Sequence, residues 1–214
     1  VNIGRAVRRK VVAHISDMNQ PLGWTVGNSL EVCEAIDTLH NAGPEDFREH
    51  CWVIAGEMLS LGGKVERLEA GIDMAKQTVA SGASWKKFRQ LIEAQGGDVR
   101  YVDEPTRFPE AHIIENIPAP RSGYLACAQA DEIGMAVVDL GGGRAKKGDS
   151  IDHSVGLVMH AKVGDRLEVG RPLFTIHAND EARFEAAIER VLSALTISDA
   201  PVEPLPLFYE RIAF

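Results

Sequence analysis

The order of apolar and polar positions divides the chain into one strand, a block of helices and a region of short strands. Residues 11–15 form an apolar, β-branched run after a basic turn, which predicts a buried strand of the kind found in parallel sheets. A loop with Pro21 and Gly23 follows. Asn28 then stands at a helix N-cap position with Glu31 three residues later, the pattern of a capping box.

Four helices are expected within residues 28–97, separated by Gly43-Pro44, Gly62-Gly63 and a short polar stretch, and closed by Gly96-Gly97. Their apolar stripes are typical of helix faces that pack into a core rather than of cofactor contacts. The stripes are Val32, Ala35, Ile36 and Leu39; Phe47, Cys51, Ile54, Ala55, Met58 and Leu61; Val65, Leu68, Ile72, Ala75 and Val79; and Trp85, Phe88, Leu91 and Ile92.

The second half of the chain has a different pattern. Strands are expected at 111–117, 123–128, 155–161 and 173–177, with turns at 163–165 and 169–172, a short helix at 132–140 and a last helix capped by Asp180. This pattern predicts a small α/β unit with its own core. The expected domains are residues 1–99, the later part of a central α/β domain, and residues 100–214, a C-terminal α/β domain.

The expected fold class is α/β: a helical segment packed on a mixed sheet, followed by the smaller α/β domain. Residues 155–177 resemble half of a biotinyl or lipoyl carrier barrel. A carrier presents its lysine at an exposed hairpin tip, typically flanked by methionines. Met159 is followed by His160 here, and Lys162 does not stand in a tight Met-Lys-Met turn. The resemblance therefore suggests a carrier-like fold without carrier function.

Composition narrows the function classes. The chain has 214 residues, 45% of them hydrophobic and 25% charged, and a formal net charge of −8. This acidity argues against a nucleic-acid partner, which requires a basic face. No run of 18 apolar residues predicts a membrane helix, and no signal-peptide pattern is present. The three cysteines, Cys33, Cys51 and Cys127, are widely spaced with no C-x-x-C pair. Cys33 and Cys51 lie on apolar helical stripes and predict buried thiols, which fits a reducing cytoplasm.

Candidate chemistry is sparse. Glu34 lies one turn into a helix, beside loop carbonyls, and suggests a hard-cation site, although spacing alone favours a solvated helix-start glutamate. Gly141-Gly142-Gly143-Arg144, with Lys146 and Lys147, suggests phosphate contacts, but the order matches no phosphate-binding motif, and a glycine turn is favoured. The seven histidines lack zinc spacing, and Asp149, Asp152 and His153 fit a solvated turn.

Several motifs, in a fixed order, resemble the pyrimidine-nucleoside phosphorylases, the family that includes thymidine phosphorylase. In that family the first of these motifs lies near the middle of the chain, so the resemblance is to the C-terminal half. It is carried by Asp17-Met18-Asn19-Gln20-Pro21-Leu22-Gly23, residues 27–34, residues 111–118, Gly134-Met135-Ala136-Val137-Val138, residues 141–144, residues 149–157 and Gly170-Arg171-Pro172-Leu173.

The resemblance implies a cytoplasmic homodimer that cleaves pyrimidine nucleosides with phosphate to a base and a pentose 1-phosphate. It implies a potassium ion held by the backbone carbonyls of Leu22 and Thr25 and by the Glu34 carboxylate. The family's Lys-His-Ser-Thr-Gly-Gly phosphate loop and its Arg, Ser and Lys base contacts do not occur in this sequence. No catalytic or substrate-binding residue is therefore assigned, and these residues alone are expected to be inactive.

Two other readings of the sequence remain. One is a phosphoribosyltransferase relative, which requires a diphosphate-binding glycine loop that this sequence lacks. The other is a non-catalytic, carrier-like or interaction module.

Overall fold

The computed structural model describes residues 1–144 and 146–213, which divide into two compact units. The first unit comprises Val1–Asp17, Ala35–Val99 and Pro206–Phe214, and the second comprises Met18–Glu34 and Arg100–Leu205. The passage from one unit to the other at residues 99 and 100 accompanies the change from long helices to short strands.

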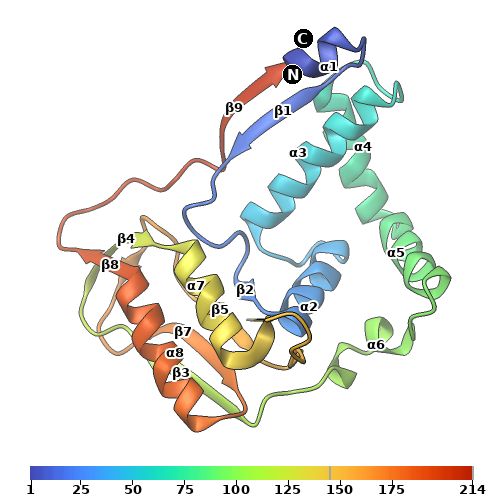
Figure 1. The fold of residues 1–214 in the computed structure, drawn as a ribbon. Coiled ribbons are helices and arrows are strands. Elements are labelled where there is room, and N and C mark those ends of the chain that lie inside the picture. The colour runs from blue at the N-terminus through green and yellow to red at the C-terminus, as the bar shows by residue number, and fades with distance from the viewer. Residues whose placement is uncertain (145, 214) are drawn as a thin grey trace. The chain divides into compact units, whose positions relative to one another are not determined.

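The first unit combines a two-stranded ribbon with helices (Figure 1). Strand β1 (Val12–Ser16) pairs with β9 (Phe208–Ala213) in an antiparallel ladder that joins Val12 to Ala213. The expectation of a buried strand in a parallel sheet is therefore wrong for this element. The partner of β1 comes from the far end of the chain, and the hydrophobic run of β1 is only half-buried.

The helices of the first unit are α1 (Asn2–Ala6), α3 (Glu45–Leu61), α4 (Leu68–Ala80), α5 (Ala83–Ala94) and the later residues of α2 (Asn28–Leu39). Helices α3 and α4 approach closely through two glycines, since a Cβ atom on Gly71 would lie 2.5 Å from the Gly56 carbonyl oxygen. The four predicted helices are present. The apolar stripes of these helices are less buried than expected. Met58 is 68% exposed and Leu91 is 49% exposed.

The second unit contains two antiparallel sheets and two long helices. One sheet has the order β2 (Thr25–Val26), β5 (Gly156–Met159), β7 (Pro172–Ala178) and β3 (Ile113–Pro118). The other has the order β6 (Arg166–Leu167), β4 (Gly123–Ala128) and β8 (Leu195–Ser198). Every pairing within the described residues is antiparallel, so the mixed sheet expected from the sequence is not observed.

Helices α7 (Ala130–Val137) and α8 (Glu181–Ala194) lie side by side in the second unit, and α8 packs on β7 (Figure 1). A π-helical turn, η2 (Val138–Gly142), continues α7, while α6 (Arg100–Asp103) and a 3₁₀ turn, η1 (Pro105–Arg107), precede β3. The core of this unit has its largest fully buried side chains at Phe174, Leu125, Ile133, Leu157, Met159, Leu173 and Ile176. The expected α/β unit with its own core is therefore present.

The carrier-type barrel is not confirmed, because the two sheets of the second unit do not close into a barrel within the described residues. Lys162 also does not stand at an exposed hairpin tip. Its ammonium group donates hydrogen bonds to the backbone carbonyls of Pro21 and Gly23. A lysine held in this way cannot carry a swinging prosthetic group, so the structure gives no support to a carrier function.

Two predicted helix caps have different outcomes. Asp180 caps α8 as expected, because its Oδ1 atom accepts a hydrogen bond from the Arg183 backbone N–H at 2.9 Å. Asn28 is instead the first residue of α2, and its side chain donates to the Gly142 carbonyl at 2.8 Å. The backbone N–H of Gly27 donates to Glu31 Oε1 at 2.9 Å, which places the cap one residue earlier than predicted.

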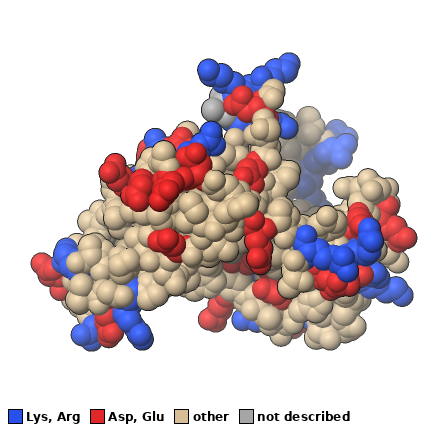
Figure 2. Space-filling model, turned by 90° about the horizontal axis from the view of Figure 1, so that it is seen from below, with Lys and Arg blue, Asp and Glu red and all other residues tan. Residues whose placement is uncertain are grey.

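The three cysteines form no disulfide among the residues that the structure describes. Each is half-buried, so Cys33 and Cys51 are less enclosed than expected. Burial raises the pKa of the Cys51 thiol. None of the helices in residues 1–144 and 146–213 combines the length and apolar character that a membrane span requires. Acidic and basic side chains form several small groups on the face shown in Figure 2.

Candidate functional site

The loop between β1 and α2 carries two of the residues expected to bind a cation, Leu22 and Thr25, and α2 carries the third, Glu34. Gly23 adopts the left-handed conformation, with φ of +71°, and Gly27 has φ of +143°. A Cβ atom on Gly27 would lie 2.6 Å from the Val155 carbonyl oxygen, so only glycine allows the chain to pass this close to β5. Strand β2 then joins the edge of the sheet beside β5. These glycines set the path of residues 21–27.

Glu34 is buried, with 9% of its surface exposed, in the part of α2 that belongs to the second unit. Its Oε1 atom accepts a hydrogen bond from the Trp24 backbone N–H at 2.8 Å. Its Oε2 atom lies against Gly23, where an added Cβ would come within 2.2 Å of that oxygen. The solvated helix-start glutamate considered from the sequence is therefore excluded, since this carboxylate is buried against the loop.

Lys162 approaches the same loop from the turn after β5. Its ammonium group donates to the Pro21 carbonyl at 2.6 Å and to the Gly23 carbonyl, and lies 4.9 Å from the centre of the Trp24 ring. The Val163 backbone N–H donates to Gln20 Oε1 at 2.9 Å. Two segments about 140 residues apart in sequence are thus joined by hydrogen bonds and a cation–π contact.

The expected cation ligands Leu22, Thr25 and Glu34 lie on this loop and on the helix that contacts it. The Trp24 carbonyl accepts from the Met159 N–H at 2.7 Å, so the next pair, Thr25 and Val158, is the non-hydrogen-bonded type. The Thr25 carbonyl consequently points away from β5. Backbone carbonyls beside a buried carboxylate are donors that suit a hard cation, so these residues fit the implied ion.

One further oxygen marks this position. The Thr25 hydroxyl oxygen is buried without a hydrogen-bond partner within the part of the chain that the structure describes. The resemblance implies that Thr25 contributes only its backbone carbonyl to the cation. The hydroxyl oxygen of Thr25 offers a second oxygen at the same residue. The same described residues include no cluster of three or more histidine, cysteine or acidic side chains, so a zinc-type centre is not present among them.

Sequence reasoning missed Lys162 as a member of this site. The lysine was considered only as a possible carrier residue, and the run Ala161-Lys162-Val163-Gly164-Asp165 predicts a turn and nothing more. Its partners are backbone carbonyls, which have no signature in a sequence. Only the fold brings the ammonium group to them.

The Gly141–Gly143 segment is a turn whose carbonyls are held by donors of the protein. Gly141 has φ of +103°, and its carbonyl accepts from the Asp152 N–H at 2.9 Å. The Gly142 carbonyl accepts from Asn28, and the Leu140 carbonyl from Arg183 at 3.4 Å. A phosphate cradle directs backbone N–H groups at its ligand. The structure instead shows the glycine turn that the sequence favoured.

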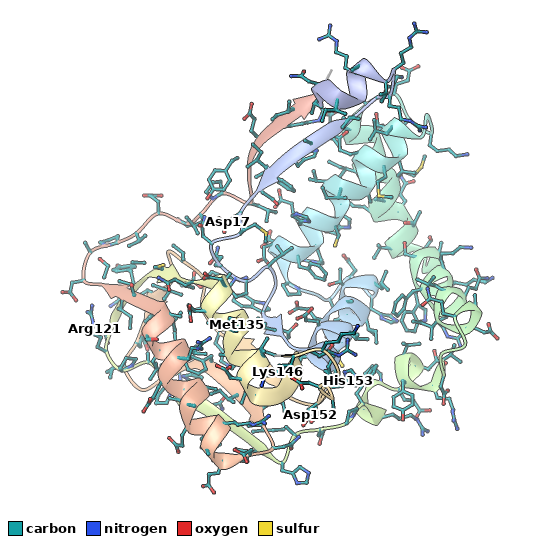
Figure 3. All side chains as sticks on the ribbon, viewed as in Figure 1. Asp17, Arg121, Met135, Lys146, Asp152 and His153 are labelled. Carbon is teal, nitrogen blue, oxygen red and sulfur yellow. The ribbon has the colours of Figure 1, made fainter. Side chains whose placement is uncertain are left out.

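Asp152 holds the end of the loop formed by residues 146–154 (Figure 3). One carboxylate oxygen accepts from the Ser154 hydroxyl at 2.6 Å and from its N–H at 3.0 Å, and the other accepts from Asn179 at 2.7 Å. Burial alone would raise the pKa of Asp152, but the hydrogen bonds from Ser154 and Asn179 outweigh it and lower the pKa. Asp152 is therefore an internal anchor and not the solvated turn residue expected.

Comparison with known proteins supports the family resemblance. Residues 124–198 match the family model described as the pyrimidine nucleoside phosphorylase C-terminal domain. The chain is 42% identical over 213 residues to a pyrimidine-nucleoside phosphorylase of Geobacillus stearothermophilus, an alignment that covers 100% of this chain and 49% of that protein. It is 41% identical over 204 residues to a pyrimidine-nucleoside phosphorylase of Staphylococcus aureus (strain NCTC 8325 / PS 47), covering 95% of this chain and 47% of the relative. The chain spans about half the length of these relatives.

Proposed function

We propose, for a chain that corresponds to the C-terminal half of the pyrimidine-nucleoside phosphorylases, that the complete polypeptide catalyses the phosphorolysis of pyrimidine nucleosides. The reaction breaks the bond between the sugar C1′ atom and the base nitrogen and forms a bond from C1′ to a phosphate oxygen. The base leaves with the electron pair and takes up a proton. The observation that carries the proposal is the identity of 42% along the whole of this chain.

The chemistry of this reaction sets what the protein must supply. Positive charge develops on the sugar as the base departs, so the phosphate dianion must be held in place and the base polarised. The loop that the resemblance assigns to phosphate and the side chains that it assigns to the base do not occur among these 214 residues. We therefore propose that these residues by themselves do not catalyse the reaction and that they support a site built with the other half.

The 21–25 loop is the part of this chain that we propose to serve that site directly. The carbonyls of Leu22 and Thr25 and the carboxylate of Glu34 would hold a potassium ion, which supplies fixed positive charge beside the phosphate loop. Glu34 is held by the Trp24 N–H at 2.8 Å, and Gly23 lets the chain turn against it. The chain's own contribution is thus to orient three oxygen ligands. A homodimer in the cytoplasm is the assembly and location that we propose.

A fused enzyme tests the proposal. The first half of the Geobacillus stearothermophilus relative is joined ahead of Val1, and thymidine and uridine are incubated with the purified fusion with and without phosphate. We expect free base and pentose 1-phosphate to form only with phosphate, and none to form with the 214-residue chain alone. Phosphorolysis by the chain alone would contradict the proposed division of labour. A folded fusion that releases no base would contradict the proposed activity.

A further inference from the structure

The ammonium group of Lys162 lies where the 21–25 loop turns two of its backbone carbonyls toward one point. The Pro21 carbonyl accepts at 2.6 Å and the Gly23 carbonyl also accepts, while the centre of the Trp24 ring lies 4.9 Å from the same group. Carbonyl oxygens and an aromatic face are the surroundings that proteins and ligands use for monovalent cations of this size. The loop therefore already binds one cation, which belongs to the chain itself.

The backbone that carries Lys162 is fixed independently of the ammonium group. The Lys162 N–H donates to Asp165 Oδ2 at 2.9 Å, and the Asp165 N–H donates back to the Lys162 carbonyl at 3.0 Å. The Gly164 N–H donates to the Leu125 carbonyl at 2.8 Å. This lysine projects from a closed turn on the core of the second unit, so its ammonium group is delivered to a set position, unlike that of a flexible surface lysine.

The carbonyl of Gly23 and the carboxylate of Glu34 link this cation to the candidate ligands. Gly23 contacts the ammonium group through its carbonyl oxygen and the Glu34 carboxylate through its Cα side. Leu22 lies between the two residues whose carbonyls Lys162 takes. Removal of the ammonium group would leave the Pro21 and Gly23 carbonyls without this hydrogen-bond donor, and the buried Glu34 carboxylate without the positive charge of Lys162. Such losses are costly in a site of low dielectric constant.

We propose that the Lys162 ammonium group acts as a tethered monovalent cation, which closes the 21–25 loop and positions the oxygen atoms of Leu22, Thr25 and Glu34. Lys162 is a positioning residue in this role, because its ammonium group acts through the carbonyls of the loop. The inference goes beyond the proposed phosphorolysis and does not require it, because the contacts lie wholly within the second unit. It predicts that a free cation of similar size replaces the ammonium group when the lysine side chain is shortened.

Chemical rescue tests this directly. Thermal unfolding of the 214-residue chain and of its Lys162→Ala variant is measured in choline chloride, potassium chloride and n-propylammonium chloride at equal ionic strength, so that screening is constant. In choline we expect the variant to lose roughly 5 °C in Tm. This is the effect of losing two hydrogen bonds from a charged donor in a chain of this size. Potassium and propylammonium should each restore at least half of that loss, whereas choline is too large to enter and cannot donate.

Matched variants separate this role from ordinary packing. Lys162→Met keeps the apolar stem over Trp24 but fills the space, so propylammonium should not rescue it. Lys147→Ala removes an exposed lysine of the same unit and should change neither Tm nor the response to any cation. The proposal would be overturned if Lys162→Ala lost the same amount of Tm in all three salts, with no rescue by any cation. It would also be overturned if Lys162→Ala had the wild-type Tm in choline. If Lys162→Ala does not fold in choline, recovery of its folding with propylammonium supports the proposal, and failure to recover with any cation overturns it.

The wild-type chain distinguishes this proposal from the one on the free potassium site. A potassium-specific rise in the wild-type Tm reports the free cation at Leu22, Thr25 and Glu34. Rescue that occurs only in Lys162→Ala reports the tethered cation. Absence of activity in the fused enzyme would contradict the proposed phosphorolysis. It would not test the free potassium site or the role of the Lys162 ammonium group.

Discussion

The carboxylate of Glu34 accepts a hydrogen bond from the backbone N–H of Trp24 at 2.8 Å, and so fixes the 21–25 loop against the first turns of α2. Ten residues separate the two groups in sequence. The carboxylate is buried, with only 9% of the residue exposed, and its other oxygen lies against Gly23. This hydrogen bond therefore fixes the geometry of the candidate site.

Removal of the Glu34 carboxylate should loosen the loop. In Glu34→Ala the buried Trp24 N–H loses its acceptor, which costs about 1–3 kcal/mol in free energy of unfolding. Glu34→Gln retains an acceptor oxygen without the charge, so we expect a smaller loss together with the disappearance of any potassium-specific stabilisation. Urea unfolding in potassium and in choline chloride checks both variants. A Glu34→Ala chain as stable as the wild type would show that the contact does not hold the loop.

Gly23 should tolerate no side chain. An alanine at φ of +71° is strained, and its Cβ would approach Glu34 Oε2 to 2.2 Å. Gly170 is the matched control, because it has φ of +81° but open space around an added Cβ. We expect Gly170→Ala to lose about 1 kcal/mol from backbone strain alone. Gly23→Ala should lose clearly more in the same denaturation experiment, and equal losses for the two variants would contradict the packing described.

Acid should destabilise the first unit through Glu57. Its side chain is buried and bonded to the Arg211 guanidinium and to His14 at 3.1 Å. The hydrogen bonds from Arg211 hold the pKa of Glu57 below its ordinary value, although burial opposes them. A lowered pKa in the folded state means that stability is full above the ordinary pKa near 4.5 and is lost as pH falls below it.

The Arg211→Met variant tests that sign. It should be less stable than the wild type at pH 7, and the difference should shrink as pH falls through the range below about 4.5. Urea unfolding at a series of pH values measures it, with Arg9→Met, an exposed residue, as the control. A difference between Arg211→Met and the wild type that stays constant across this range would argue against the Glu57 pair as its source.

A second acid response should come from His50, which stacks on Phe208 with ring centres 5.1 Å apart. Burial, and to a lesser degree the charge of His14, lower the pKa of His50. The neutral ring is therefore the form that folding favours, and stability falls as pH drops through the range below the ordinary value of 6.5. His50→Phe keeps an aromatic ring against Phe208 and removes this titration.

The same pH series checks the His50 prediction. The wild-type free energy of unfolding should decline between about pH 6.5 and 5, before the Glu57 effect begins. In His50→Phe this earlier decline should be reduced. An identical slope for both proteins in that range would assign it to another histidine.

Local patterns in the sequence were sufficient for most elements. One helix was expected between Pro44 and Gly62-Gly63, another before Gly96-Gly97 and a strand at 123–128. They formed at Glu45–Leu61, Ala83–Ala94 and Gly123–Ala128, because spacing and flanking glycine or proline are local signals. The helix cap at Asp180 followed from the same chemistry. The comparisons support the resemblance to the pyrimidine-nucleoside phosphorylases: residues 124–198 match that family's C-terminal domain, and the whole chain aligns with about half of a relative.

Pairing and burial were not predictable in this way. The sequence by itself determined where most helices and strands form and the glycine turn at 141–143, and the family resemblance supplied Leu22, Thr25 and Glu34 as candidate oxygen ligands. Only the tertiary structure decided that β1 pairs with β9, that Glu34 is buried against Gly23 and that Lys162 closes the loop. The physical reason is that propensity and periodicity act over a few residues, whereas these contacts join groups up to about 200 residues apart. Many of these groups belong to the backbone, which is the same at every position and therefore gives no signal in the pattern of side chains.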